Sequence, residues 1–240
     1  MNGRHRILIN PAPCRGYADT VYWFFRSTAV RPILLAYFRV RVIGRENLPR
    51  RGAAILASNH LAFVDSLFIP SVAPRKITYL VGSNYFTKSG LLGRLLGWFL
   101  KQIGMLPIDR TGGSAAKASL DLGLQVLSEN GLIGIYPEGT RSRDGKMHRG
   151  RTGVARLALE AGVPLVPVAI QGTDKILQKG KRLPQRVDIT ITIGRPLRFE
   201  TVVGDHDAKQ LRAVTDEVMG AIRALTPQEY VDAYAVSTRD

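Results

Sequence analysis

The chain is poor in cysteine and in acidic residues. It has one cysteine, Cys14, among 240 residues, so neither an intrachain disulfide nor a cysteine-based metal site can form. This content fits a reducing compartment. Asp and Glu number 19 against 34 Lys and Arg, which gives a formal net charge of +15. Such an excess indicates an acidic partner, whether a nucleic acid, an anionic membrane or a phosphorylated substrate.

Two further features are missing. No charge-free apolar run approaches the roughly 18 residues that a membrane-spanning helix needs, and residues 1–14 do not have the pattern of a signal peptide. The Gly-x-Ser-x-Gly segment that carries the nucleophile of many hydrolases is also absent. We therefore expect a chain that does not span a membrane and has no such nucleophile.

Short apolar runs alternate with segments of helical spacing. The expected strands are residues 53–57, 77–81, 105–108, 132–136, 163–170 and 187–193. The expected helices are residues 91–103, 114–129, 152–161 and 207–225. This order predicts an α/β fold with a single domain, in which helices flank a central, mostly mixed β-sheet. The prolines in residues 163–168 predict an edge or bulged strand there.

Residues 17–42 mix large apolar and aromatic side chains with arginines, and Pro32 is expected to break or kink this segment into two helical pieces. Aromatic side chains suit the headgroup region of a membrane, and arginines suit lipid phosphates. The alternative is a helix pair packed on the domain with solvated arginines. We divide the chain into a basic, aromatic, amphipathic helical membrane-contact segment at residues 1–45 and a main domain at residues 46–240.

His60 and Asp65 are the first candidates for chemistry. His60 follows the expected strand 53–57, and Asp65 opens the next apolar segment, where a carboxylate suits a helix N-terminus. If the connection folds back, the carboxylate can hold one imidazole nitrogen and leave the other free to take a proton. That arrangement is the base and orienting group of a catalytic triad, without its nucleophile. A lone histidine without a chemical role is the alternative.

Two arginine-bearing segments also follow expected strands. The segment Tyr136-Pro-Glu-Gly-Thr-Arg-Ser142 combines a carboxylate, a glycine, a hydroxyl and an arginine. Arginine can hold a phosphate through two hydrogen bonds, and glycine allows a ligand to approach the backbone closely. The segment Gly104-x-Leu-x-Ile-x-Arg110 again ends in an arginine. Because α/β folds bind ligands at strand ends, both segments are candidates for a phosphate site.

Four segments, taken in order, resemble the blocks of the glycerolipid acyltransferases. They are the HX4D motif Asn59-His60-x4-Asp65, then Gly104-x-Leu-x-Ile-x-Arg110, Tyr136-Pro-Glu-Gly-Thr-Arg-Ser142 and Val163-Pro-Leu-Val-Pro-Val168. The most similar type is the bacterial 1-acyl-glycerol-3-phosphate O-acyltransferase. Tyr136 stands where phenylalanine is common in the family.

The resemblance implies an O-acyltransferase of phospholipid biosynthesis in which His60, oriented by Asp65, is the general base. The attacking hydroxyl then belongs to a glycerol-phosphate acceptor, so the protein needs no nucleophile of its own. It also implies that Arg110 and Arg141 hold the acceptor phosphate and that Glu138 and Thr140 order this pocket or contact the glycerol. Gly139 belongs to the same substrate-binding group. No metal and no cofactor are expected.

The same resemblance implies the partners. The acyl donor is acyl-CoA or acyl-carrier protein, the acceptor is a lysophosphatidic-acid-like lipid, and the location is peripheral or monotopic at the cytoplasmic face of the cell membrane. Alternative acceptors are glycerol-3-phosphate, another lysophospholipid or a glycolipid. A basic nucleic-acid- or membrane-binding protein without activity is the non-enzyme alternative, although no nucleic acid is expected. The apolar helix at residues 91–103 either lines an acyl-chain groove or packs in the core.

Overall fold

The computed structural model describes residues 15–83, 86, 90–108, 115–177, 183–201 and 206–236. A seven-stranded sheet lies at its centre, in the order β1-β8-β7-β2-β5-β3-β4. These strands are β1 (Arg39–Ile43), β2 (Ala54–Ser58), β3 (Ile77–Gly82), β4 (Met105–Ile108), β5 (Leu132–Ile135), β7 (Leu165–Gln171) and β8 (Asp188–Ile193). Neighbouring strands run parallel except β7 and β8, so the sheet is mixed, as predicted.

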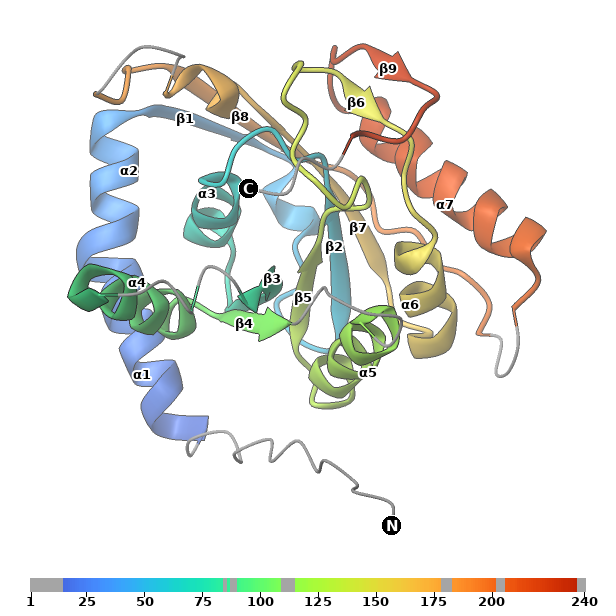
Figure 1. The fold of residues 1–240 in the computed structure, drawn as a ribbon, viewed down its shortest axis with the longest axis horizontal. Helices are drawn as coiled ribbons and strands as arrows, with labels where there is room; N and C mark the ends of the chain where they lie inside the picture. Colours follow the sequence, from blue (N-terminus) through green and yellow to red (C-terminus); the bar gives the residue numbers. More distant parts are fainter. Residues whose placement is uncertain are drawn as a thin grey trace.

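Helices flank the sheet, which confirms the predicted α/β fold (Figure 1). They are α1 (Arg15–Phe25), α2 (Arg31–Tyr37), α3 (Asp65–Val72), α4 (Gly90–Gln102), α5 (Ala115–Ser128), α6 (Gly153–Ala161) and α7 (Ala208–Arg223). A short pair of strands, β6 (Met147–His148) and β9 (Tyr230–Val231), lies apart from the main sheet. None of the helices in the described ranges is long and apolar enough to cross a membrane.

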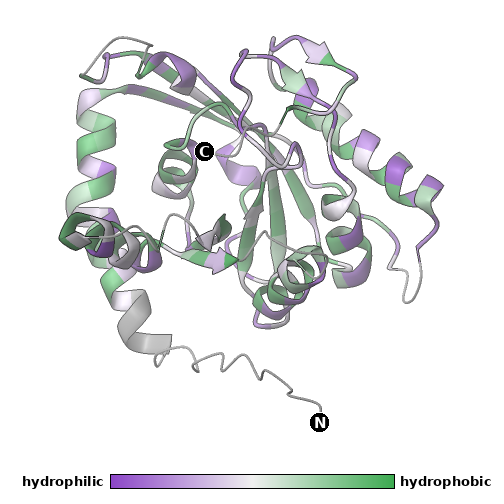
Figure 2. Ribbon diagram, in the orientation of Figure 1, coloured by the Kyte–Doolittle hydropathy of each residue, from purple (hydrophilic) through white to green (hydrophobic). Residues whose placement is uncertain are grey.

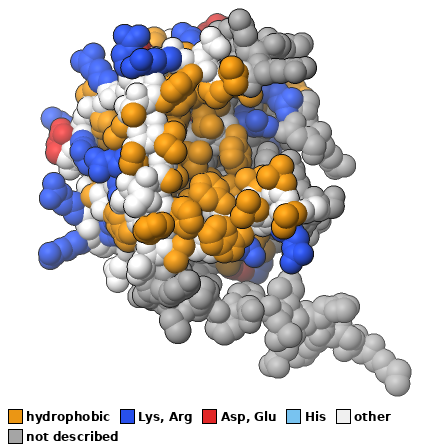
Figure 3. Space-filling view, turned by 90° about the vertical axis from the view of Figure 1, so that its left-hand side faces the viewer, with side chains coloured by type: hydrophobic (Ala, Val, Ile, Leu, Met, Phe, Trp, Pro, Cys, Tyr) orange, Lys and Arg blue, Asp and Glu red, His pale blue; other side chains and the backbone are white. Residues whose placement is uncertain are grey.

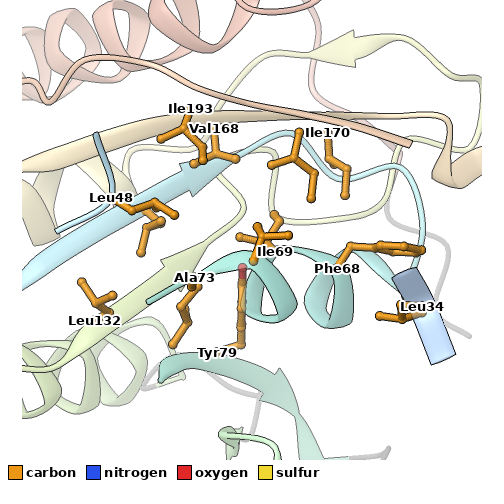
Figure 4. Close-up of a cluster of buried hydrophobic side chains, with 14 of the residues drawn as sticks. Leu34, Leu48, Phe68, Ile69, Ala73, Tyr79, Leu132, Val168, Ile170 and Ile193 are labelled. Carbon is orange, nitrogen blue, oxygen red and sulfur yellow. The ribbon is translucent and has the colours of Figure 1, made fainter. Parts of the chain in front are cut away.

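Alternate side chains of the central strands enter two different cores. In β2, Leu56 belongs to the larger apolar cluster with α2, α3 and the end of α4, part of which is drawn in Figure 4. Its neighbour Ile55 belongs to the cluster with α5, α6 and α7. Successive side chains of a strand point to opposite faces of the sheet, so a strand covered on both faces reads as a continuous apolar run. Figure 2 shows these hydrophobic central strands beside the two-faced helix α7.

The N-terminal segment forms the two expected helical pieces, α1 and α2, but its last residues do not continue as helix. A π-helical turn, Arg26–Val30, joins α1 to α2, and Pro32 lies in the first turn of α2. Residues 39–43 form strand β1 rather than helix and pair with β8 in the main sheet. Their residues alternate between exposed and half-buried, which is the period of a strand and not of a helix.

The expected edge position of the proline-containing strand is wrong. Strand β7 lies inside the sheet between β8 and β2. A bulge is nevertheless present in its partner: two residues, 166–167, separate Leu165 from Val168, whereas three residues, 194–196, separate their partners Ile193 and Leu197. Pro167 therefore faces an irregular stretch of the neighbouring strand, where its missing N–H interrupts no regular ladder.

Arg26 connects the N-terminal helices to the domain. Its guanidinium is buried and donates hydrogen bonds to three carbonyl oxygens at the end of α3, with Nε 3.0 Å from the Pro70 oxygen and Nη2 3.1 Å from the Ser71 oxygen. The third acceptor is the Ala73 oxygen, 2.5 Å from Nη2. A cation at a helix C-terminus meets unpaired carbonyls and the negative end of the helix dipole, so this contact anchors α3.

Candidate active site

The two main candidate segments meet at one edge of the sheet. Strands β2 and β5 are adjacent and parallel, so the loops that follow them emerge at the same carboxyl edge. His60 lies in the loop after β2, and residues 136–142 form the loop after β5. The Ser142 N–H donates to the His60 carbonyl oxygen at 2.7 Å, which joins the two loops directly.

The Asp65 carboxylate holds the His60 ring. Its Oδ2 atom lies 2.8 Å from His60 Nδ1 and also accepts from the N–H groups of Leu61, at 2.7 Å, and Ala62, at 2.8 Å. The connection folds back because the Asp65 N–H donates to the Ala62 carbonyl oxygen in a tight turn. Asp65 is fully buried at the start of α3, so three donors converge on one desolvated oxygen.

This contact leaves the other imidazole nitrogen available. A carboxylate only accepts hydrogen bonds, so Nδ1 carries the proton and Nε2 has the free lone pair. Among the described residues, no group forms a hydrogen bond with Nε2, and the His60 side chain keeps 14% of its surface exposed. The arrangement can accept a proton from a hydroxyl that reaches Nε2.

Tyr136 lies flat against one face of the imidazole. The two ring centroids are 3.8 Å apart, with an angle of 9° between the planes. The Tyr136 hydroxyl is 2.8 Å from Ser66 Oγ on α3, and Tyr79 stacks on Tyr136 in turn. Burial raises the pKa of both tyrosines above the usual range, so their hydroxyls stay neutral. The stack therefore limits rotation of the His60 ring without adding charge.

Gly134 makes room for this stack. A Cβ atom at this position of β5 would lie 2.3 Å from Tyr79 Cε1, which is far inside van der Waals contact. From the sequence, Tyr136 was placed only as the first residue of its block, and no role was predicted for Ser66, Tyr79 or Gly134. No local pattern marks these residues, because their contacts join separate strands and helices.

Glu138 is buried and ties the two loops together. Its Oε1 atom accepts from the His60 N–H at 3.4 Å, and its Oε2 atom accepts from the His148 N–H at 2.9 Å. Burial raises the pKa of this carboxyl to about 7, although both hydrogen bonds favour the charged form. Both oxygens accept from backbone N–H groups, so Glu138 links the His60 loop to the segment around His148.

The remaining predicted residues of this loop lie nearer its surface. Gly139 is exposed and has a φ of +75°, a conformation that favours glycine, and an added Cβ would lie 2.9 Å from Arg151 Cδ. Thr140 and Arg141 are half-buried. Arg110 lies outside the described residues, so the structure brings His60, Asp65, Glu138 and Arg141 into neighbouring loops without placing Arg110.

Asn59 is a buried residue of the HX4D segment to which the sequence analysis gave no role. Its Nδ2 donates to the Ile170 carbonyl oxygen at 2.9 Å, and its Oδ1 accepts from the Ile170 N–H at 2.8 Å. These two bonds fix the end of β2 to the end of β7. Across the described ranges, no group of three or more His, Cys, Asp or Glu side chains could hold a metal ion.

The apolar helix α4 packs in the core on one side only. Gly93, Gly97 and Leu100 face inward, whereas Leu91 and Leu92 are 84% and 81% exposed. Gly97 permits close packing, because a Cβ there would lie 3.0 Å from the Phe86 carbonyl oxygen. Of the two alternatives for this helix, core packing therefore accounts for its inner side, and its leucine-rich side remains uncovered.

Comparison with known proteins identifies the family. The acyltransferase family model matches residues 39–171, more than half of the chain. The 1-acyl-sn-glycerol-3-phosphate acyltransferase of Bacillus subtilis is 29% identical over 203 residues, which cover 84% of this chain and 95% of that protein. The protein of the same name from Limnanthes douglasii is 31% identical over 74% of this chain and 61% of its own length. Against the longer chloroplast relative BAT2 of Brassica napus, the matched part is 46% of that protein.

A solved structure shares the fold. The 1-acyl-sn-glycerophosphate acyltransferase PlsC from Thermotoga maritima superimposes with a TM-score of 0.61 at 20% sequence identity, covering 87% of this chain and 93% of that one. The family that the four sequence blocks predicted is thus confirmed by a match that includes all four of them in full. The chain belongs to the acyltransferase family of enzymes.

Proposed function

We propose that this enzyme transfers a fatty acyl group from a thioester donor, acyl-CoA or acyl-carrier protein, to the free hydroxyl of 1-acyl-glycerol-3-phosphate, which yields phosphatidic acid. The observation that carries the proposal is the buried Asp65 bound to His60 beside the loop that contains Arg141. The names of the relatives from Bacillus subtilis and Limnanthes douglasii support this acceptor.

In the proposed reaction His60 is the general base. Its Nε2 takes the proton of the acceptor hydroxyl as the oxygen attacks the thioester carbonyl carbon, and the carbonyl electrons move onto its oxygen. Collapse of this tetrahedral species re-forms the carbonyl, breaks the carbon–sulfur bond and returns the proton from His60 to the leaving thiolate. Asp65 keeps Nδ1 protonated and stabilises the transient imidazolium. General-base catalysis of this kind contributes about 10²–10⁴-fold in rate.

The acceptor phosphate binds to arginine. Arg141 lies in the loop joined to His60 and can present two parallel N–H groups to a phosphate, and Arg110 is proposed as a second cation of this pocket. Glu138 holds the backbone of both loops, and Thr140 contacts the glycerol part of the acceptor. Gly139 lets the loop turn sharply between Glu138 and Thr140.

The enzyme binds an anionic membrane surface at the cytoplasmic face of the cell membrane. The exposed sides of α1, α2 and α4 make this contact. Figure 3 shows this side of the molecule, with apolar side chains gathered together and basic side chains around them. The Phe25 ring meets the Trp98 ring edge to face at 5.6 Å, so α1 and α4 form one continuous face. The exposed large apolar residues of this face are Trp23, Phe24, Ile33, Leu35, Tyr37, Leu91, Leu92, Leu95 and Trp98.

Purified protein assayed with acyl-CoA and a panel of acceptors tests the reaction. The panel contains 1-acyl-glycerol-3-phosphate, glycerol-3-phosphate, a lysophospholipid with a larger headgroup and a glycolipid, and mass spectrometry identifies the products. We expect phosphatidic acid from the first acceptor and none from folded His60→Ala protein. Preferential acylation of another acceptor would overturn the proposed substrate, and normal turnover by His60→Ala would overturn the proposed base.

Vesicle flotation tests the membrane surface. Leu92→Glu should release protein from anionic vesicles, because a charge replaces an apolar side chain in the proposed contact. Val236→Glu, at an equally exposed position in the C-terminal segment, is the matched control and should float like the parent protein. Equal flotation of both variants would show that α4 does not contact the membrane.

A further inference from the structure

The segment after α7, Thr226–Val236, crosses the loop that follows Glu138, and we call it the C-terminal strap. Its strand β9 pairs in parallel with β6 (Figure 1). The Met147 N–H donates to the Glu229 carbonyl oxygen at 2.7 Å, and the Arg149 N–H donates to the Ala233 carbonyl oxygen at 3.0 Å. The strap lies beyond residues 39–171, which match the family model.

The strap and the candidate active site hold opposite sides of the same short strand. Between Met147 and Arg149, the His148 N–H points the other way and donates to Glu138 Oε2 at 2.9 Å. Successive N–H groups of an extended strand point to opposite sides, so one side binds the strap and the other binds the site carboxylate. The other oxygen of Glu138 accepts from the His60 N–H. Glu138 therefore connects β6 to the His60 loop, and a shift of β6 would move that loop.

One side chain of the strap joins the two site loops directly. Gln228 Oε1 accepts from Asn59 Nδ2 at 2.9 Å, and Gln228 Nε2 donates to the Gly145 carbonyl oxygen at 2.9 Å. Asn59 is buried and immediately precedes His60. Gly145 lies in a turn, residues 142–146, that begins next to Arg141. A single amide therefore connects the residue that precedes the proposed base to the turn that follows Arg141.

The turn at residues 142–146 is held together by hydrogen bonds of its own and by an ion pair to the strap. Asp144 Oδ1 accepts from Ser142 Oγ and from the Lys146 N–H, each at 3.1 Å. Lys146 also forms an ion pair with Glu229 of the strap at 2.8 Å. The Ser142 N–H in turn donates to the His60 carbonyl oxygen, which closes a ring of hydrogen bonds through Asn59, Gln228, the turn and His60.

We propose that Gln228 is a positioning residue, which sets the distance between His60 and the Arg141 loop by acting through Asn59 and Gly145. It does not touch the substrates. The inference deepens the proposed function and rests on it for the role of Arg141. Without this amide, the Asn59 side chain keeps its bonds to Ile170, and the turn keeps only the bond from the Ser142 N–H to the His60 carbonyl oxygen as its direct tie to the His60 loop.

Gln228→Met removes both hydrogen bonds at nearly constant volume. We expect the KM for 1-acyl-glycerol-3-phosphate to rise about three- to tenfold, the loss of about one net hydrogen bond, with the KM for acyl-CoA unchanged. A merely structural role would lower the amount of folded enzyme and leave both KM values unchanged. The matched control is Gln185→Met, because the Gln185 side chain donates to the Leu183 carbonyl oxygen in an exposed segment away from the strap.

Two further variants separate the contacts. Gln228→Glu can still accept from Asn59 but cannot donate to Gly145, so it should share the higher acceptor KM. In an Arg141→Ala background, Gln228→Met should raise the acceptor KM little further, because its effect passes through the Arg141 loop. An unchanged acceptor KM in Gln228→Met, or a full additive effect in the double variant, would overturn the proposal.

Hydrogen exchange provides a readout that does not depend on the acceptor. In Gln228→Met, and not in Gln185→Met, amides of residues 142–149 should exchange faster, because the turn and β6 are less constrained. Unaltered exchange would overturn the role of Gln228 even if the enzyme is active. Absence of acylation by the parent protein, with faster exchange in the variant, would instead overturn the proposed function and leave the strap contact supported.

Discussion

Replacing Asp65 with asparagine tests how the His60 ring is held. Asparagine has nearly the same size as aspartate, so the buried site keeps its packing and loses one charge. In the parent protein, Asp65 Oδ2 accepts three hydrogen bonds, from His60 Nδ1 and from the N–H groups of Leu61 and Ala62. Asp65 Oδ1 is buried and has no hydrogen-bond partner among the described residues.

Both orientations of the asparagine amide are unfavourable. With its oxygen toward His60, three charge-assisted hydrogen bonds become neutral ones, at about 1 kcal/mol each, and the NH2 group is buried without an acceptor, at about 1–3 kcal/mol more. With its NH2 group toward His60, the ring is driven to the tautomer with Nε2 protonated, which cannot act as the base. In a Ser-His-Asp catalytic triad, replacing the aspartate that orients the histidine with asparagine lowers kcat about 10⁴-fold.

We therefore expect Asp65→Asn to lower kcat by about 10³–10⁴-fold and the free energy of unfolding by about 4 kcal/mol, with little change in either KM. Initial rates with acyl-CoA and 1-acyl-glycerol-3-phosphate measure the first quantity, and urea unfolding measures the second. Asp121→Asn is the control, because Asp121 forms an exposed ion pair with Lys117 on α5 worth about 0.3–0.5 kcal/mol. A folded Asp65→Asn enzyme with kcat within about tenfold of the parent would refute this reasoning.

Three other substitutions test the site and its supports. Burial raises the folded-state pKa of Glu138 to about 7, so its contribution to stability is fully present below the ordinary carboxyl pKa and is lost as pH rises through 7. Glu138→Gln should therefore remove about 3 kcal/mol from the pH dependence of the free energy of unfolding, measured in urea. An unchanged pH dependence of the unfolding free energy would contradict this prediction. Gly134→Ala should displace the Tyr79 ring and destabilise the protein by about 1–3 kcal/mol, whereas Gly220→Ala, which has open space in α7, should stabilise it by about 0.5–1 kcal/mol; equal melting temperatures would contradict the packing. Arg26→Met should leave the end of α3 without its buried donor and lower the free energy of unfolding by about 3 kcal/mol, and a change near zero would show that the contact does not anchor α3.

Local sequence patterns were sufficient for most of the elements. Period two and period 3.6 predicted the strands and helices of the domain, because burial of one or both faces of an element imposes its period on the residues themselves. The prediction failed at residues 39–42, where alternating valine and arginine were included in a helical segment. It failed again for β7, because a strand's place in the sheet depends on its neighbours and not on its own prolines.

The His60–Asp65 contact could be anticipated because it is local. The two residues are five positions apart, and a single tight turn brings the carboxylate to Nδ1. The family blocks could be read for the same reason, since each is a short continuous segment. By itself, the sequence therefore determined the α/β fold class, the family and the contact between His60 and Asp65, the proposed base and its orienting group.

Only the tertiary structure decided how that pair is supported. Tyr136 reaches Ser66 across 70 positions, and Gln228 reaches Asn59 across 169, so neither contact leaves a periodic or local signal. Glu138 was predicted to order the pocket or contact the glycerol, and its two oxygens lie on backbone N–H groups from two loops. The physical reason is that adjacent parallel strands bring their carboxyl ends together, and the sequence does not state which strands are adjacent.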